Sequence, residues 1–480
     1  MEEFRRAEVR SINVERDREW LLWPSSGPGE LDLRLDVVGV GEANERFASH
    51  YFNLLVVDTR GADTQVCSIA ADLIEELQRD AGPDRAFPAN RVVAVLDDCD
   101  ELASRTFELG RLRIRSFVTR PFEAKALRRE IDEVLAKGRK LGKVALCLSG
   151  GGVEGLLFEL GVIRALNAYL EHRSITDCDI FCGISAGSIL AAFLANGVEP
   201  REIIHGLEGR EGGIEPIGPH LLYDIDTKTL ASKLLAIYKA LIGNPNPDQL
   251  VSRVMKAVPT GFFKGRRIEA MVERELTKPE RTNNFEQVRP ELYIGATDLD
   301  TFEHRIFGLP GNRHVPISRA VRASCGLMPY YGPTVVDGRY YVDGQYTRTA
   351  NFHLAVERGA TLILVVDPLV PVRAERAGYV AGKGGIYASI QGVKGVIHTR
   401  FTNAIAHAAE AYPDVNFHIF TPEQEDRQVL SGSPMKYTVR TQIIDVAYRC
   451  AVEKIHDRAD LLRVHMARHG FQLRTSPRPR

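Results

Sequence analysis

A serine flanked by glycines follows a short apolar stretch near the middle of the sequence. The segment DIFCGISAGSIL, residues 179–190, places Ser185 in the pattern G-x-S-x-G, between Gly183 and Gly187. A serine at a sharp turn between a strand and a helix presents its hydroxyl to a substrate, and glycines permit the crowded backbone of that turn. The pattern therefore predicts a nucleophilic serine that attacks an acyl group.

A glycine-rich turn precedes this serine by one strand. The segment VALCLSGGGVEG, residues 144–155, contains Gly150, Gly151, Gly152 and Gly155. A dinucleotide would use such a turn for its phosphates, but that fold needs an acid at the end of its second strand, whereas Asp177 and Asp179 precede the strand. Because the serine turn follows next, we interpret the glycines as an oxyanion hole, whose backbone N–H groups stabilise the reacting oxygen.

A serine hydroxyl needs a base to remove its proton, and the residues offer two. Asp367, after the apolar run LILVV, could combine with His398 or His407 in a Ser-His-Asp triad of the usual α/β-hydrolase order. Asp343, in YYVDGQ, ends another apolar run before Gly344 and could act without a histidine if burial raised its pKa. From the residues alone, both alternatives remain open.

The order of these motifs resembles that of patatin-like phospholipases over residues 143–370. The glycine turn, GISAG, ATDLDTFEHRIF, AVRASCGLMPYY and YVDGQ follow one another as in that family. The resemblance implies a Ser–Asp dyad, with Ser185 as nucleophile and Asp343 as base, and an oxyanion hole at Gly150–Gly152. It also implies an acyl-ester lipid such as a phospholipid as substrate, and no metal or organic cofactor. The elbow and turn glycines would be Gly155, Gly183, Gly187 and Gly344.

Two residues depart from the family pattern. Glu154 stands in the glycine turn where the family usually has Arg or Lys, and Gln345 stands where it has Gly or Ala. An anionic side chain beside the entry would repel anionic headgroups. We therefore expect a preference for zwitterionic or neutral acyl esters. Altered or lost activity is the other reading, in which the chain is a lipid-binding or signalling scaffold with a vestigial elbow.

The first part of the chain, residues 1–138, alternates apolar runs with amphipathic segments, which predicts a doubly wound parallel sheet. The expected strands are LRLDVVGV, NLLVVD, RVVAVLD and IRSFVT, and helices are expected at SIAADLIEELQRD, residues 68–80, and DELASRTFELGRL, residues 100–112. The segment resembles a response-regulator receiver domain, with Asp58 at the phosphoacceptor position. Arg120 replaces the family's lysine, and no adjacent acidic pair follows the first strand to hold Mg²⁺. We therefore expect a degenerate receiver used for contact or dimerisation rather than a working phosphoswitch.

The rest of the chain divides into a hydrolase domain, residues 139–370, and a C-terminal loop and helical extension, residues 371–480, that packs on it. The overall expectation is an α/β protein in which the receiver-like sheet precedes a patatin-like α/β/α three-layer hydrolase domain. Strands are expected at VALCLS, DIFCGIS, LYIGATD, YYVDG and LILVVD, and a surface loop at 371–395. A helical insertion at 200–285 carries an apolar face that suits core packing, or a lid or acyl-chain channel opening at a membrane.

Composition restricts the partners of the protein. Its 62 Lys and Arg balance 63 Asp and Glu, for a net charge of −1, so no overall field favours nucleic acid. No run of about 18 apolar residues indicates a membrane span, and the N-terminus, MEEFRRAEVR, lacks an apolar signal region. The seven cysteines form no CxxC pair. We expect reduced cysteines and a cytoplasmic protein that makes transient contact with a membrane surface.

Overall fold

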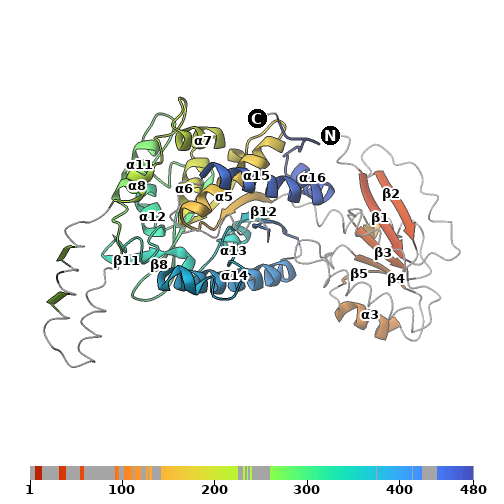
Figure 1. Ribbon diagram of the computed structural model, residues 1–480. Coiled ribbons are helices and arrows are strands. Elements are labelled where there is room, and N and C mark those ends of the chain that lie inside the picture. Colours follow the sequence, from red (N-terminus) through yellow and green to blue (C-terminus); the bar gives the residue numbers. More distant parts are fainter. Residues whose placement is uncertain are drawn as a thin grey trace, which may run out of the picture. The chain divides into compact units, whose positions relative to one another are not determined.

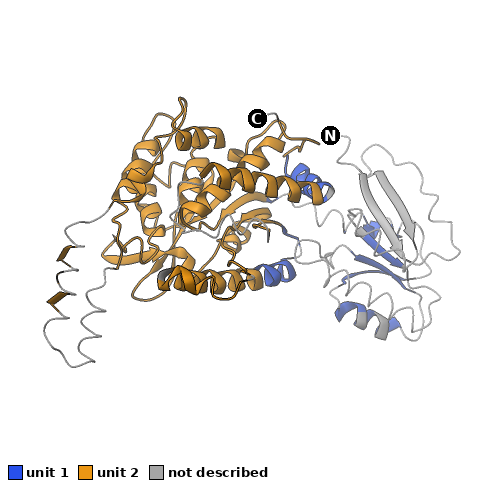
Figure 2. Ribbon diagram, in the orientation of Figure 1, with its two compact units in different colours: residues 1–142, 405–417, 458–470 blue, residues 143–404, 418–457, 471–480 orange. Residues whose placement is uncertain are grey.

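The structure is a computed structural model with two compact units. Unit 1 comprises residues 1–142, 405–417 and 458–470, and unit 2 comprises residues 143–404, 418–457 and 471–480 (Figure 2). The structure describes residues 6–12, 32–38, 54–58, 92–96, 102–111, 114–119, 126–127, 129–131, 134, 142–224, 231–232, 235, 238–239, 260–374, 376–412, 414–423 and 440–478. Within these residues, no helix is both long and apolar enough to cross a membrane.

Unit 1 contains a five-stranded parallel sheet of order β2-β1-β3-β4-β5, an order shared by flavodoxin-like doubly wound folds. Its strands are β1 (Arg6–Ile12), β2 (Asp32–Val38), β3 (Leu54–Asp58), β4 (Val92–Leu96) and β5 (Ser116–Thr119). The four strands expected from apolar runs are confirmed. The strand β1 was missed because charged residues alternate with its apolar ones. The helix α3 (Leu102–Arg111) is also as expected, whereas the segment 68–80, expected to be helical, lies outside the described residues.

Unit 2 is organised around a second sheet, of order β10-β11-β8-β7-β6-β12-β13, with β9 paired to β8. Its centre is parallel: β8, β7, β6 and β12 run side by side in one direction, while β9 and β11 are antiparallel to β8. The strands are β6 (Lys143–Leu148), β7 (Ile180–Ile184), β8 (Glu291–Asp298), β9 (His304–Phe307), β10 (Thr334–Val336), β11 (Arg339–Asp343), β12 (Ala360–Val366) and β13 (Asn416–Phe420). The five strands expected here are all present.

Helices cover both faces of this sheet (Figure 1). The crossovers from β6 to β7 and from β7 to β8 use α5 (Gly152–Tyr169) and α6 (Ala186–Ala195), which lie on one face because such connections are right-handed. The crossover to β12 runs in the opposite direction and places α13 (Phe352–Glu357) on the other face, where α14 (Gly385–Ala411) also lies. The fold thus has three layers.

The helix α5 is buried nearly all round, because α15 (Arg440–Asp457) packs on the side that faces away from the sheet. The two helices approach closely at Gly161, where a Cβ atom would lie 2.5 Å from the Ile444 carbonyl oxygen. A segment more than 270 residues downstream in the sequence therefore completes the layer next to the glycine turn. The other α-helices of unit 2 in its described residues are α7 (Pro200–Glu208), α8 (Pro219–Leu222), α11 (Arg266–Leu276) and α12 (Ile317–Ser324), whereas α16 (Ala459–Arg468) belongs to unit 1.

Two expectations about the outer segments have different outcomes. The surface loop expected at 371–395 is wrong from Gly385 onward, where α14 begins. Its glycines Gly385, Gly392 and Gly395 face open space, so they interrupt no packing, and the helix proceeds through them. The apolar segment 229–243 of the expected insertion lies largely outside the described residues, as do residues 240–259. The lid or channel reading of that segment stays a prediction.

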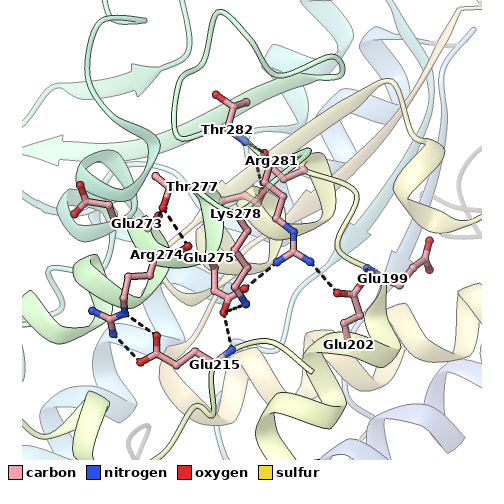
Figure 3. Close-up of polar contacts among 12 residues, drawn as sticks. Glu199, Glu202, Glu215, Glu273, Arg274, Glu275, Thr277, Lys278, Arg281 and Thr282 are labelled. Atoms are coloured by element: carbon pink, nitrogen blue, oxygen red, sulfur yellow. Dashed lines mark hydrogen bonds and ion pairs between the residues drawn. The ribbon is translucent and has the colours of Figure 1, made fainter. Parts of the chain in front are cut away.

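An ion-pair cluster joins α7 to α11 (Figure 3). Glu275, at 1% side-chain exposure, lies 2.8 Å from the Arg281 guanidinium and 2.7 Å from the Lys278 ammonium, and it accepts the N–H of Glu215 at 2.7 Å. Arg281 also binds Glu202 at 2.8 Å. Every buried charge in this cluster faces a charge of opposite sign. We call Glu202, Glu215, Arg274, Glu275, Lys278 and Arg281 the ion-pair cluster.

Candidate active site

Strand register brings the predicted site residues together. Leu148 pairs with Gly183, Ile184 with Gly295, and Asp343 with the next residue of β8, Ala296. The residues that follow β6 and β7 and the last residue of β11 therefore lie in one row across four adjacent strands. Parallel sheets of this kind bind ligands at the carboxyl ends of their strands.

Ser185 occupies a strained turn between β7 and α6. Its φ of 54° and ψ of −131° lie in a backbone region that residues other than glycine rarely adopt. This is the conformation of a nucleophile elbow. The flanking glycines allow this turn to pack. A Cβ atom on Gly183 would lie 2.5 Å from Ser188 Cα, and one on Gly187 would lie 2.8 Å from Leu148. The G-x-S-x-G spacing is therefore a packing requirement of the turn.

The end of α12 holds the backbone of the elbow. The Ser185 N–H donates to the Ser324 hydroxyl at 2.7 Å, and that hydroxyl donates to the Gly295 carbonyl at 2.6 Å. The Ser185 carbonyl accepts from the Ser188 hydroxyl at 2.5 Å and from the Cys325 thiol at 3.3 Å. Ser324 was missed as a site residue, although AVRASCGLMPYY contains it, because nothing in the sequence places α12 beside the elbow.

Asp343 is fully buried at the end of β11. Its Oδ1 accepts the Gln345 N–H at 3.0 Å, whereas its Oδ2 has no hydrogen-bond partner of regular geometry within the described residues. Burial raises the pKa of Asp343 to about 7, and the nearby Ser185 side chain and the Gln345 N–H partly oppose this rise. A carboxylate with this pKa is a far stronger base than an exposed aspartate and is still ionised in a large fraction of molecules near neutral pH.

The glycine turn contacts the elbow directly. Gly150, Gly151 and Gly152 have φ values of 87°, 115° and 69°, all in the left-handed region. A Cβ atom on Gly150 would lie 2.4 Å from the Ile184 carbonyl oxygen and 2.8 Å from Ser185 Cβ. Only glycine allows this approach. Gly155 and Gly344 also lack room, since their Cβ atoms would lie 2.2 Å from the Gly150 oxygen and 2.4 Å from the Gly295 oxygen, respectively.

The three turn amides differ in their partners. Gly150 N–H donates to Glu159 Oε1 at 2.6 Å. The N–H groups of Gly151 and Gly152 make no hydrogen bond to any described residue, and they stand at the N-terminus of α5. A helix N-terminus attracts negative charge through its dipole and its unpaired N–H groups. The arrangement can therefore accept an oxyanion on two amides while the third is already used.

Glu154 lies in the first turn of α5 and is only 2% exposed. It faces Lys394 of α14. Burial lowers the pKa of Lys394, and the negative charge of Glu154 opposes this decrease. The expected repulsion of anionic headgroups by Glu154 therefore loses its physical basis. The side chain is enclosed, and a cation on another helix lies within its electrostatic reach.

The histidine-dependent alternative is not assembled. Asp367 is fully buried, but its carboxylate accepts from the Ser149 hydroxyl at 2.7 Å and from the Leu369 N–H at 3.2 Å rather than from a histidine. His407 is exposed. No hydrogen bond joins Ser185 to a histidine in the part of the chain that the structure describes. Burial raises the pKa of Asp367, and the charge of His398 is one of the influences that oppose this rise.

The described residues contain neither the acid that a dinucleotide site would need nor a group of metal-binding side chains. Asp179 Oδ2 accepts the Val144 N–H at 2.8 Å, and Asp177 Oδ2 accepts the Ser174 N–H at 2.9 Å, so both acids bind local backbone. No group of three or more His, Cys, Asp or Glu side chains there could hold a metal ion. In unit 1, Asp58 is the last residue of β3, and the structure describes its backbone but not its side chain.

Comparison with known proteins identifies the domain that carries this site. The uncharacterized protein R571 of Acanthamoeba polyphaga mimivirus is 26% identical over 204 residues, which cover 42% of this chain and 58% of that protein. VipD from Legionella pneumophila gives a TM-score of 0.31 at 15% identity, covering 66% of this chain and 67% of VipD. Human GIVD cytosolic phospholipase A2 gives a TM-score of 0.31 at 14% identity, with 69% and 63% coverage. Residues 146–210 and 222–356 match the model of the patatin-like phospholipase family, so this chain contains a patatin-like phospholipase domain.

Proposed function

We propose that the chain is a serine acyl hydrolase that cleaves acyl-ester bonds of phospholipids or related lipids. Ser185 is the nucleophile and Asp343 its base. The observation that carries this proposal is the pairing of a strained elbow serine with a fully buried aspartate whose pKa is raised to about 7. Buried acids with raised pKa values beside a nucleophile are typical of catalytic sites.

The reaction follows from these groups. Asp343 takes the hydroxyl proton as Ser185 Oγ attacks the ester carbonyl, and the carbonyl oxygen becomes an oxyanion that accepts from the Gly151 and Gly152 N–H groups. The tetrahedral intermediate then collapses to the acyl-enzyme, and the leaving alcohol takes the proton from Asp343. Water attacks the acyl-enzyme with Asp343 again as base, and the fatty acid leaves as Ser185 regains its proton. One oxyanion donor contributes about 3 kcal/mol to such a barrier.

The experiment is lipid-product mass spectrometry on phospholipid vesicles with wild type, Ser185→Ala and His398→Ala, alongside labelling by a fluorophosphonate probe. We expect free fatty acid and label from wild type and His398→Ala, and neither from Ser185→Ala. Loss of activity in His398→Ala would favour the histidine triad. A wild type that releases no fatty acid and takes no label would leave the scaffold alternative.

Unit 1 supports a second, smaller proposal. We propose that it is a degenerate receiver-like domain that serves contact or dimerisation, because its five parallel strands have the order of flavodoxin-like sheets and Asp58 ends the third strand. Light scattering of the full chain would show a dimer that persists in Asp58→Asn and is unchanged by acetyl phosphate. A change in oligomeric mass on phosphorylation would instead indicate a working switch.

We further propose a cytoplasmic enzyme that binds its lipid substrate at a membrane surface.

A further inference from the structure

Two acids that the reaction does not use lie directly beneath the glycine turn. Glu159 is two helical turns into α5, and Asp367 follows β12, the neighbour of β6. Both are fully buried. They come from different elements, Glu159 from the helix that follows the turn and Asp367 from the end of the strand next to β6. Burying a carboxyl group is costly unless hydrogen bonds or an opposite charge compensate for the lost solvation.

These acids bind consecutive residues of the turn. Glu159 Oε1 accepts the Gly150 N–H at 2.6 Å, and Asp367 Oδ1 accepts the Ser149 hydroxyl at 2.7 Å. Asp367 Oδ1 also accepts the Leu369 N–H at 3.2 Å. The second oxygens, Glu159 Oε2 and Asp367 Oδ2, make no hydrogen bond within the described residues. Each acid therefore uses one oxygen to anchor the turn.

No lysine or arginine forms an ion pair with either acid among the residues described. Burial raises the pKa of Glu159, and the charge of Asp367 raises it further, although the Gly150 and Ser149 N–H groups oppose the rise. Burial likewise raises the pKa of Asp367, against the Ser149 hydroxyl, the Leu369 N–H and the charge of His398. Neighbouring buried carboxyl groups do not both ionise readily, which agrees with the raised pKa of each acid.

Gln345 connects this anchor to the catalytic base. Its side-chain amide donates to the Ser149 carbonyl, and its backbone N–H donates to Asp343 Oδ1 at 3.0 Å. The Gln345 carbonyl is held in turn by the Arg400 guanidinium of α14 at 2.6 Å. The departure from Gly or Ala at this position thus gives the turn a hydrogen-bonded link that neither of those side chains could form.

We propose that Glu159 and Asp367 are positioning residues that hold the glycine turn against the Ser185 elbow, with Gln345 linking the turn to Asp343. This inference rests on the proposed hydrolase function. The turn and the elbow are in contact at Gly150, so a shift of the turn changes where the Gly151 and Gly152 N–H groups point relative to Ser185. Oxyanion donors act only at about 2.7–3.1 Å from the reacting oxygen, which makes their placement decisive.

The kinetic test compares Glu159→Leu with Glu159→Gln. Leucine removes the acceptor for Gly150 N–H, whereas the glutamine amide oxygen retains it. We expect kcat to fall about 100-fold in Glu159→Leu, as for loss of an oxyanion donor, with KM changed less than about twofold. Glu159→Gln should restore most of this loss, and Gln345→Ala should lower kcat about tenfold. The matched control is Glu275→Gln, a buried carboxylate of the ion-pair cluster, whose kcat should stay near wild type.

A second measurement is independent of activity. Hydrogen exchange followed by mass spectrometry on peptides covering residues 148–156 should be about tenfold faster in Glu159→Leu and close to wild type in Glu159→Gln. Unchanged exchange in Glu159→Leu would overturn the inference even if the wild type were inactive. Faster exchange with unchanged kcat would overturn the positioning role alone. An inactive wild type with the expected exchange pattern would reject the hydrolase function and keep the anchor.

Discussion

Two regions of unit 2 contain buried carboxylates that have opposite surroundings. In the ion-pair cluster, Glu275 contacts two cations, and Arg274 lowers the pKa of Glu215 through a paired hydrogen bond. At the active site, burial raises the pKa values of Asp343, Glu159 and Asp367, and no lysine or arginine pairs with them within the described residues. Cations stabilise the buried negative charge in the first region, whereas in the second region burial without a cation raises the proton affinity of the acids.

This contrast separates a structural from a chemical use of the same functional group. A carboxylate that is paired with a cation stays ionised near neutral pH, and removing it leaves a buried partner charge without its counterion. An unpaired one exchanges its proton in the range where catalysis occurs, at some cost in stability. Substitutions at the proposed site should therefore change the rate, whereas substitutions in the ion-pair cluster should change the stability.

The largest effect is expected for Asp343→Asn. The amide cannot accept the Ser185 proton, so kcat should fall by about 10⁴-fold, as when a member of a catalytic constellation is removed. The free energy of unfolding at pH 8 should not decrease, because the variant removes a buried charge that has no cation. Steady-state hydrolysis and urea denaturation of the same preparation measure both quantities. A folded variant with more than a tenth of wild-type activity would exclude Asp343 as the base.

The pH dependence tests the same group with a smaller effect. Because the base must be ionised and its pKa is about 7, kcat/KM should fall about tenfold per pH unit below that value. The raised pKa means that the folded state binds the proton more tightly than the unfolded state. The stability that Asp343 contributes is therefore full below about pH 4 and is lost as pH rises through 7. Activity that stays flat from pH 8 to 5 would contradict the assignment, and Asp343→Asn should remove this part of the stability change.

The ion-pair cluster should respond in stability rather than in rate. Arg281→Met leaves Glu275, which is 1% exposed, with one cation fewer and should lower the free energy of unfolding by about 3 kcal/mol. Catalysis per folded molecule should not change. Arg274→Met is the matched control, since its side chain is 56% exposed and should cost less than about 1 kcal/mol. Equal losses in the two variants, measured by chemical denaturation, would remove the distinction.

The smallest effect is expected for Glu154→Gln. Because Glu154 is 2% exposed and lies in the field of Lys394, its charge acts weakly at the surface. The ratio of rates on phosphatidylglycerol and phosphatidylcholine vesicles should therefore change by less than about threefold. An inverted headgroup preference in this variant would restore the entry-repulsion reading of Glu154.

The sequence predicted the elements of the site better than their contacts. Local pattern placed Ser185 and the two candidate acids, Asp343 and Asp367, at strand ends, and the family resemblance chose Asp343. The structure puts Ser185 and Asp343 in one row of the sheet. Apolar runs also identified every strand of the row, since its three parallel strands, β6, β7 and β8, are buried and largely apolar, and β11 carries a shorter apolar run before Asp343. The strand β1 was not predicted because charged residues alternate along it. The start of α14 was not predicted because glycines usually indicate a loop, although a helix tolerates them on its exposed side.

The anchoring contacts could not be predicted because they depend on register between distant segments. Ser324 binds the Ser185 N–H across 139 positions of sequence, and Asp367 binds Ser149 across 218. Glu159 looked like one more residue of a helix, and Asp367 resembled the acid of a triad. Whether a buried acid serves as base, anchor or ion-pair partner depends on which cations and amides surround it, and no local pattern contains that information.

The row of strand ends also has a consequence for the order in which the turn is assembled during synthesis. Ser149 emerges from the ribosome more than two hundred residues ahead of Asp367, which at about 5–20 residues per second is a delay of tens of seconds or less. Until β12 pairs with β6, the turn lacks one of its two anchors, although the nucleophile and the base already exist. A nascent chain would therefore carry an incompletely anchored glycine turn, and on the proposed hydrolase function it would gain activity only after β12 has joined the sheet.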